Sequence, residues 1–213
     1  AGHRLIFGVA GSGKTVVLVA RARFLSEAHP TGQMLVLCFN VSLKTYLQSV
    51  LKPCSNVTVI TFHGWGRRNG IPWETNEPGD AFGTRLLTHL QAGQGEAGKY
   101  DAVLIDEAQD FEPSWFLCAL EAMKEPRNGE LLVVGDGSQS AYRRSKISWR
   151  QLGIRAQGRT RHLTRNYRNT RVILEAAKAF AGGNEDDDGI SASACDPASS
   201  AREGASRPIF VER

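Results

Sequence analysis

Short apolar runs alternate along the chain with segments of helical periodicity. Five runs of apolar, often β-branched residues are bounded by Gly, Asp or Asn, at residues 5–9, 34–39, 57–61, 102–105 and 131–134. Runs of this length predict strands that are buried on both faces of a sheet. Amphipathic helices are predicted between them, over residues 14–27, 41–51 and 113–124. This alternation predicts right-handed βαβ units, and therefore an α/β fold with a parallel sheet flanked by helices.

The composition changes near residue 182. Residues 182–208 consist largely of Gly, Ser, Ala and Asp, with an acidic run at 185–188. This predicts a disordered acidic loop at about 182–207, followed by the start of another strand at 209–211. We expect a first domain over residues 1–155, with a linker near 153–158. Residues 156–213 would then be the linker and the truncated beginning of a second domain, so that the chain is a fragment of a longer protein.

The overall composition is that of an ordinary globular protein, with 41% hydrophobic and 23% charged residues. No apolar run approaches the roughly 18 residues that span a bilayer, and no secretory signal is present, so we expect no membrane partner. The four cysteines have no metal-binding spacing, and we expect reduced thiols, with Cys38 and Cys118 in the core. These features predict a cytoplasmic protein and leave association with the nucleoid open.

The net charge of +4 is distributed unevenly along the sequence. Between Asp136 and Glu175 there is no acidic residue, but there are ten lysines and arginines. Such a stretch produces a positive field that attracts polyanions, including nucleic acids. A solvated face, or a surface that meets an acidic partner domain, is an equal alternative.

A glycine-rich motif follows the first predicted strand and opens the first predicted helix. Gly8-Val-Ala-Gly-Ser-Gly-Lys14-Thr15 matches G-x-x-x-x-G-K-[ST], in the context that gives the match its meaning. Gly8, Gly11 and Gly13 let the backbone curl so that N–H groups, including that of Ser12, point at a phosphate. Lys14 would reach the β- and γ-phosphates, and the Thr15 hydroxyl would bind Mg²⁺. A glycine-rich turn without a ligand is the alternative. The motif predicts nucleotide binding, with ATP and Mg²⁺ as cofactors.

Two acidic residues follow the fourth predicted strand. Asp106 would emerge at the carboxyl edge of a parallel sheet, where ligands bind in such folds. There it can hold Mg²⁺ together with Thr15, while Glu107 can act as a general base on an attacking water. Adjacent acids at a buried strand end are costly unless a cation or hydrogen-bond donors satisfy them. A pair that merely caps the strand end is the alternative.

These motifs and several later ones resemble those of a known family. The segment Asp106-Glu-Ala-Gln-Asp110, together with Val134-Gly-Asp-Gly-Ser-Gln139-Ser-Ala-Tyr142-Arg143, resembles the UvrD/Rep-like branch of superfamily 1 helicases. Three further matches occur in the expected order: Cys38-Phe-Asn40, Thr61-Phe-His63 and Asn166-Tyr-Arg-Asn169. The resemblance implies two RecA-like P-loop NTPase domains that hydrolyse ATP at their interface and move along single-stranded DNA. This chain would hold the first domain and the start of the second, whose remainder would be a partner.

The resemblance also implies roles for later residues. Gln139 would sense the γ-phosphate, Tyr167 would stack on adenine, and Arg168 would act as an arginine finger, in addition to catalytic roles for Lys14 and Glu107. An arginine against the γ-phosphate stabilises charge in the transition state. Without the resemblance, Arg168 is one of ten basic residues and Tyr167 an ordinary core aromatic.

Nucleic-acid contacts are predicted where the matching segments follow strands. Sequence-tolerant binding of single strands needs aromatic platforms and a basic groove. The residues assigned to this role are Phe39, Asn40, Thr61, Phe62, His63, Tyr142, Arg143 and Arg144. Core packing of the phenylalanines and a structural role for His63 are the alternatives. Single-stranded DNA is the expected partner, with RNA not excluded.

The sequence departs from the family pattern in several places. Only 45 residues separate Thr61 from Asp106, where larger members carry an accessory domain, so strand separation is in doubt. Arg144 occupies a position that is usually aromatic, and the later motifs of the second domain are absent. We therefore predict an ATP-dependent translocase or helicase motor domain of low activity as a fragment. A P-loop kinase for a small molecule and a nucleotide-regulated, non-catalytic nucleic-acid-binding module are the alternatives.

Overall fold

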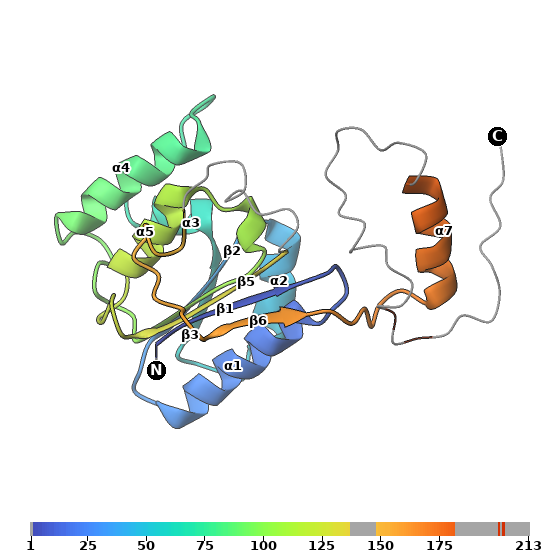
Figure 1. Ribbon diagram of the computed structural model, residues 1–213. Helices are drawn as coiled ribbons and strands as arrows, with labels where there is room; N and C mark the ends of the chain where they lie inside the picture. The colour runs from blue at the N-terminus through green and yellow to red at the C-terminus, as the bar shows by residue number, and fades with distance from the viewer. Residues whose placement is uncertain (1, 137–147, 182–199, 201, 203–213) are drawn as a thin grey trace.

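A computed structural model describes residues 2–136, 148–181, 200 and 202 (Figure 1). Six strands form one sheet in the order β3-β2-β4-β5-β1-β6, and every neighbouring pair is parallel. The strands are β1 (His3–Gly8), β2 (Met34–Cys38), β3 (Val57–Thr61), β4 (Ala102–Ile105), β5 (Glu130–Gly135) and β6 (Thr160–Leu163). The predicted α/β fold with a parallel sheet is confirmed. Because all strands run in the same direction, their carboxyl ends lie along one edge.

Helices cover both faces of the sheet (Figure 1). One face packs against α1 (Lys14–Ala28) and α2 (Val41–Val50), and the other against α3 (Phe62–Arg68), α4 (Gly79–Gln91) and α5 (Pro113–Glu121). A short 3₁₀ turn, η1 (Ala108–Asp110), follows β4, and α7 (Arg171–Ala181) stands apart from the sheet. No helix in the described part of the chain is long and apolar enough to cross a membrane.

The sheet separates two hydrophobic cores because alternate side chains of a strand point to opposite faces. In β2, Leu35 and Leu37 belong to the core under α3, α4 and α5, whereas Val36 belongs to the core under α1 and α2. This two-sided burial explains why the inner strands are apolar at consecutive positions. Cys38 and Cys118 are both buried, as predicted.

The chain turns directly from strand into helix at two of the carboxyl ends. After β2, Oδ1 of Asn40 accepts the N–H of Leu43 at 2.7 Å and so caps α2. After β3, Oγ1 of Thr61 accepts the N–H of Gly64 at 3.2 Å and caps α3. Each cap satisfies one N–H that the first helical turn leaves without a partner. The residues beside these caps are therefore held at the carboxyl edge.

All five predicted strands and all three predicted helices are present, with ends that coincide or differ by at most three residues. The pattern did not predict α3, α4, α7 or β6. Because β6 pairs with β1, the first sheet continues past the expected boundary at residue 155 and past the linker expected at 153–158. The expected strand at 209–211 and nearly all of the acidic loop at 182–207 lie outside the described residues. The division into two domains stays a prediction.

Candidate active site

The phosphate loop connects β1 to α1. Gly11 and Gly13 have φ angles of +76° and +89°, which lie in the left-handed region that favours glycine. A tight turn forms where the N–H of Ser12 donates to the carbonyl of Val9 at 3.1 Å. Helix α1 begins at Lys14, so its N–H groups and the positive end of its dipole meet the loop. This curl presents backbone donors to an anion.

Lys14 provides a cation inside this loop. Its side chain is buried, and its ammonium donates to the carbonyls of Gly8 at 2.8 Å and Val9 at 3.2 Å. The Ser12 hydroxyl is also buried and has no hydrogen-bond partner among the described residues. A buried hydroxyl without a partner is costly, and phosphate oxygens would satisfy it.

Asp106 ends β4 and is completely buried. Its Oδ1 accepts the N–H of Glu107 at 2.9 Å, while Oδ2 has no hydrogen-bond partner in the described part of the chain. Burial raises the pKa of Asp106 to about 6, and the Glu107 carboxylate adds to this increase. The Thr15 hydroxyl and the Lys14 ammonium favour the ionised form of Asp106, and so oppose this increase in its pKa. The acidic strand end and the phosphate loop therefore meet in one place.

This donor set matches the requirements of Mg²⁺. A hard cation takes oxygen ligands, and Mg²⁺ is usually held by one or two protein oxygens together with phosphates. The unpartnered Oδ2 of Asp106 and the neighbouring Thr15 hydroxyl are such oxygens. A bound cation would also remove the cost of burying the Asp106 charge. The residues present fit the metal that the sequence implied.

The substitution Asp106→Asn is expected to stabilise the protein in the absence of nucleotide and Mg²⁺. The pKa of the carboxyl rises from 3.8 to about 6 on folding, so its ionisation costs the folded state about 3 kcal/mol at pH 8. As the pH falls toward 5, the folded carboxyl regains its proton and the advantage of asparagine shrinks to about half. Urea unfolding at both pH values measures the difference. An advantage independent of pH would contradict this assignment.

Glu107 lies at a strained position directly after Asp106. Its φ is +51°, which is unusual for a residue other than glycine and is often retained at functional sites. Its Oε2 accepts a hydrogen bond from Nε2 of Gln109 at 2.6 Å. Oε1 of Gln109 in turn accepts a hydrogen bond from the N–H of Asp136 at 2.9 Å. Asp136 follows β5, which lies between β1 and β4 in the sheet. Glu107 is thus connected through Gln109 to the end of the neighbouring strand.

The segment after β6 packs on the phosphate loop. The N–H of Tyr167 donates to the carbonyl of Gly11 at 2.9 Å. A Cβ added at Gly11 would lie 2.7 Å from both Arg168 Cβ and Asn166 Oδ1, so only glycine allows this approach. Tyr167 leaves 55% of its surface exposed, as a stacking platform requires. The roles of Tyr167 and Arg168 stay predictions, but both residues lie at the loop.

Asn166 shapes this segment, although the sequence alone predicts no separate role for it. It is fully buried, and its Oδ1 accepts the N–H groups of Arg168 and Asn169, each at 2.9 Å. An asparagine that bonds to backbone two and three residues later forms a local turn. This turn directs Tyr167 and Arg168 toward the loop. The signal in the sequence is Asn166 itself, because asparagine favours such local turns.

Of the residues predicted to contact nucleic acid, Phe39 and His63 lie in an aromatic cluster at the ends of β2 and β3. Their rings meet edge to face with centroids 6.0 Å apart, and Phe39 is 40% exposed. The His63 ring also packs against the rings of Trp73 and Trp115, with centroids 4.8 and 5.0 Å apart. Burial lowers the pKa of His63, which favours the neutral ring. Asn40, whose backbone directs the start of α2, is exposed beside Phe39.

The predicted nucleic-acid contacts of Phe62 and Thr61 are corrected by the burial of both side chains. Phe62 is fully buried and stacks on Trp115 with centroids 4.2 Å apart, so its side chain belongs to the core and cannot reach nucleic acid. Thr61 is buried, and its hydroxyl caps α3. Core packing, which the sequence left open for Phe62, is the observed outcome. Gln139, Tyr142, Arg143 and Arg144 lie outside the described residues.

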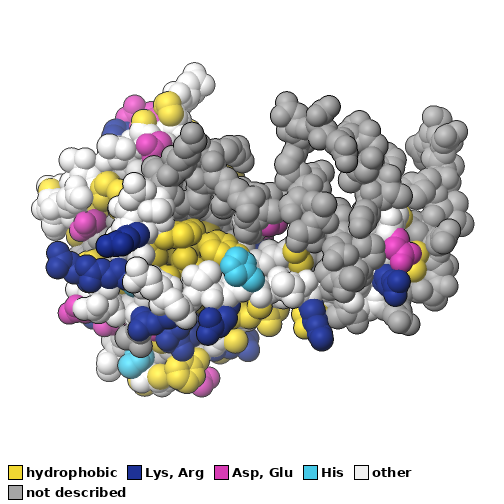
Figure 2. Space-filling view, viewed as in Figure 1, with side chains coloured by type: hydrophobic (Ala, Val, Ile, Leu, Met, Phe, Trp, Pro, Cys, Tyr) yellow, Lys and Arg dark blue, Asp and Glu magenta, His cyan; other side chains and the backbone are white. Residues whose placement is uncertain are grey.

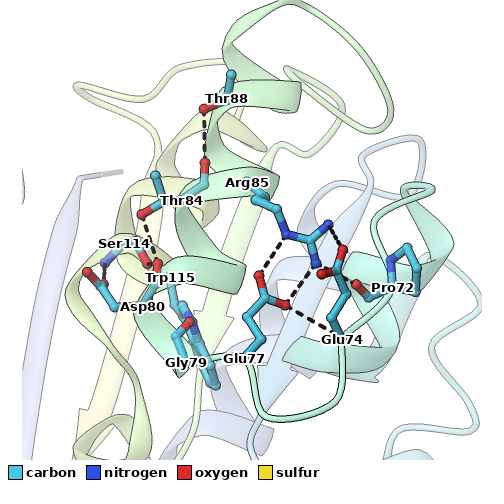
Figure 3. A network of polar contacts seen from close by, with 10 residues as sticks. All are labelled: Pro72, Glu74, Glu77, Gly79, Asp80, Thr84, Arg85, Thr88, Ser114 and Trp115. Atoms are coloured by element: carbon cyan, nitrogen blue, oxygen red, sulfur yellow. Dashed lines mark hydrogen bonds and ion pairs between the residues drawn. The ribbon is translucent and has the colours of Figure 1, made fainter.

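Trp73 extends the exposed aromatic surface, although the sequence alone predicts no role for it. It is 42% exposed, and its ring lies 4.8 Å from His63. Arg85 of α4 holds the residues on both sides of it: it donates to the carbonyl of Pro72 at 2.8 Å and pairs with Glu74 at 3.1 Å (Figure 3). Arg85 also donates to both oxygens of Glu77, at 2.7 and 2.8 Å. Several contacts from one guanidinium therefore fix the segment that presents Trp73.

The described part of the basic stretch contributes exposed cations. Lysine and arginine side chains gather on the face that shows β6 and α1 (Figure 2). Five exposed arginines come from the turn before β6, from β6 itself and from the segment after it: Arg155, Arg159, Arg161, Arg165 and Arg168. Arg165 and Arg168 follow the carboxyl end of β6, whereas Arg155 and Arg159 lie beside His3 and Gly2 at the amino end of β1. Together they give this face a positive field.

Comparison with known proteins gives a family. The profile of a family described as "AAA domain" matches residues 1–145. Among solved structures, domain III of the replication initiation protein DnaA from Thermotoga maritima is 15% identical, with a TM-score of 0.41. That match covers 89% of this chain and 66% of the DnaA chain. No curated protein matches the sequence.

The family match spans β1 through β5 and includes both the phosphate loop and the acidic strand end. These are the two parts that the fold brings together around a buried lysine and a buried aspartate. The chain therefore belongs to the AAA domain family, and is a nucleotide-binding P-loop ATPase.

Proposed function

We propose that the chain is the ATP-hydrolysing motor domain of a UvrD/Rep-like translocase that acts on single-stranded DNA. The observation that carries the proposal is the arrangement along one sheet edge. The phosphate loop, the Asp106–Glu107 pair and the exposed Phe39 all follow the carboxyl ends of parallel strands. The exposed Trp73, in the segment between α3 and α4, contacts His63 beside the end of β3. A motor needs its nucleotide site and its track to share a rigid element, and this edge supplies one.

At the nucleotide, each residue has a separate task. Lys14 and the loop N–H groups would bind the β- and γ-phosphates, and Ser12 would donate its hydroxyl there. Thr15 and Asp106 would hold Mg²⁺, which when bound neutralises phosphate charge. Glu107 would accept a proton from the attacking water, Tyr167 would stack on adenine, and Arg168 would stabilise charge on the γ-phosphate. The contacts of the 166–168 segment with Gly11 support the last two assignments.

At the nucleic acid, we propose that Phe39, His63 and Trp73 form a stacking surface. Exposed rings held in place by neighbours lose little conformational entropy when a base stacks on them. The rings of Phe39 and Trp73 both contact His63, so the three form one continuous surface. Arg165, exposed directly after the carboxyl end of β6, would meet the phosphate backbone. Tyr142, Arg143 and Arg144 remain part of the proposed track.

We also propose a division of the chain after β6. The pairing of β6 with β1 in one sheet supports placing residues through Leu163 in the first RecA-like domain. The residues from Asn166 onward, including α7, would begin the second domain, whose remainder would complete the ATP site. In this proposal the ATP site is shared by two domains, so activity is tested in a protein that contains both.

The proposed function predicts that single-stranded DNA accelerates ATP hydrolysis by the full-length protein at least tenfold, and that Phe39→Ala weakens DNA binding about tenfold. Base stacking on an aromatic side chain contributes about 1–3 kcal/mol, which corresponds to this loss. Steady-state ATPase rates and fluorescence anisotropy with labelled oligonucleotides provide the measurements. Phe24→Ala is the matched control, because Phe24 is exposed on α1, at the opposite end of the domain from the proposed track.

The same assay separates the alternatives. Hydrolysis that no oligonucleotide stimulates would reject the motor and leave a kinase for a small molecule. DNA binding that responds to nucleotide without turnover would indicate a regulatory, non-catalytic module. A matched RNA oligonucleotide shows which nucleic acid is the track.

A further inference from the structure

Gln109 uses both ends of its amide at the candidate active site. Its Nε2 donates to Oε2 of Glu107 at 2.6 Å, and its Oε1 accepts the N–H of Asp136 at 2.9 Å. One side chain therefore joins the proposed general base to the first residue after β5. The bond to Glu107 involves a carboxylate, and such charge-assisted bonds are roughly twice as strong as neutral ones.

The backbone around Gln109 is itself held in place, so the side chain that joins Glu107 to Asp136 starts from a fixed position. The N–H of Asp110 donates to the carbonyl of Glu107 at 3.0 Å, and the N–H of Phe111 donates to the carbonyl of Ala108 at 3.2 Å. Phe111 is buried in the core under α5, so the 3₁₀ turn is anchored at its end. With the backbone held in this way, the orientation of the Glu107 carboxylate depends on its side-chain partner.

The end of β5 is packed closely against this turn. A Cβ added at Gly135 would lie 3.1 Å from the Cβ of Ala108 and 3.2 Å from Oε1 of Gln109. The N–H of Asp136 is therefore close to the turn, where a glutamine reaches it. A glutamate at 109 would accept from Asp136 but could not donate to Glu107 when ionised, and a methionine would do neither.

We propose that Gln109 is a positioning residue, which sets the orientation of the Glu107 carboxylate and couples it to the end of β5. The proposal rests on the function proposed above, in which Glu107 activates water. Because β5 lies between the strands that carry the phosphate loop and Asp106, a displacement at Asp136 would reach Glu107 through one amide. The Glu107 carboxylate would thus keep a fixed position relative to both the phosphate loop and Asp106.

Two substitutions in the full-length protein separate the ends of the amide. Gln109→Glu removes the donor to Glu107 and keeps the acceptor for Asp136, whereas Gln109→Met removes both. We expect each variant to lower kcat for ATP hydrolysis 10- to 100-fold, while the Kd for ATP changes less than threefold. Hydrogen exchange at Asp136, followed by mass spectrometry, should accelerate in Gln109→Met and stay slow in Gln109→Glu. Gln91→Glu, at an exposed position on α4, is the matched control.

The outcomes distinguish this inference from the function on which it rests. Glu107→Gln is measured in parallel. If Glu107→Gln is inactive while Gln109→Glu keeps the wild-type kcat, only the positioning role is overturned. If Glu107→Gln hydrolyses ATP normally, the proposed general base is wrong, and the role of Gln109 is rejected with it. A parallel rise in Kd and fall in kcat, with loss of thermal stability in both Gln109 variants, would show a structural role and reject positioning.

Discussion

Lys14→Ala is expected to weaken ATP binding at least 100-fold. The Lys14 ammonium is buried in the curl of the phosphate loop, bonded to the carbonyls of Gly8 and Val9. Those two bonds hold a positive charge where the phosphates of a nucleotide would lie. Losing a charge-assisted bond in a buried site costs about 3 kcal/mol, and every 1.4 kcal/mol is a factor of ten in Kd. Calorimetric titration with a non-hydrolysable ATP analogue measures the change.

The control for Lys14→Ala is Lys52→Ala, which removes an exposed lysine after α2 and should leave the Kd unchanged. Circular dichroism should report a folded Lys14 variant, because the carbonyls that it leaves can be solvated. Binding within threefold of the wild type would mean that the loop N–H groups suffice, and would reject the proposed role of Lys14.

The sheet was largely predictable because its inner strands are buried on both faces. Consecutive apolar residues in β2, β4 and β5 have no other explanation in a chain of this composition, and their ends follow from the polar residues beside them. Strand β6 escaped prediction because it lies at the edge of the sheet and exposes Arg161 and His162. An edge strand needs no continuous apolar run.

Helices α3 and α4 escaped prediction for a different reason. Each contains glycines, which oppose helix formation by about 1 kcal/mol each. In α4, a Cβ at Gly83 would overlap Ser114 and Trp115 of α5, so close packing between the helices requires glycine there. Tertiary contact therefore overrides local propensity, and a reading of local sequence cannot detect it.

In the candidate site, too, local motifs were predictable from the sequence and tertiary contacts were not. The phosphate loop and the acidic strand end are local motifs, and their spacing was sufficient to predict them. Trp115, more than 50 positions later, stacks on both Phe39 and Phe62. Phe62 also packs against Phe82 and Phe111 and is fully buried, whereas Phe39 is 40% exposed. The roles inferred for Trp73 and Gln109 depend on contacts with Arg85 and Asp136. Such contacts leave no trace in the local pattern.

Glu107→Gln is expected to preserve ATP binding within threefold and to lower turnover 100- to 1000-fold. Glutamine has nearly the same shape, so its oxygen can still accept the bond that Gln109 donates. An amide cannot take a proton from water, and a positioned general base contributes about 10²–10⁴-fold to a rate. The loss should therefore fall on kcat and leave the nucleotide affinity almost unchanged. Single-turnover hydrolysis and equilibrium binding in the full-length protein measure the two quantities separately.

Asp110→Asn is the matched control for Glu107→Gln, because it neutralises an acid three residues away on the same 3₁₀ turn. Burial and the Glu107 carboxylate raise the pKa of Asp110, so the charges of the two acids oppose each other. Removing the charge at 110 should leave turnover within threefold, since asparagine keeps the backbone N–H that donates to the carbonyl of Glu107. A large loss in both variants would mean that the summed charge of the turn matters and not the position of one carboxylate. Normal turnover by Glu107→Gln would transfer the general base to another group, and Asp136 at the end of β5 would be the next residue to replace.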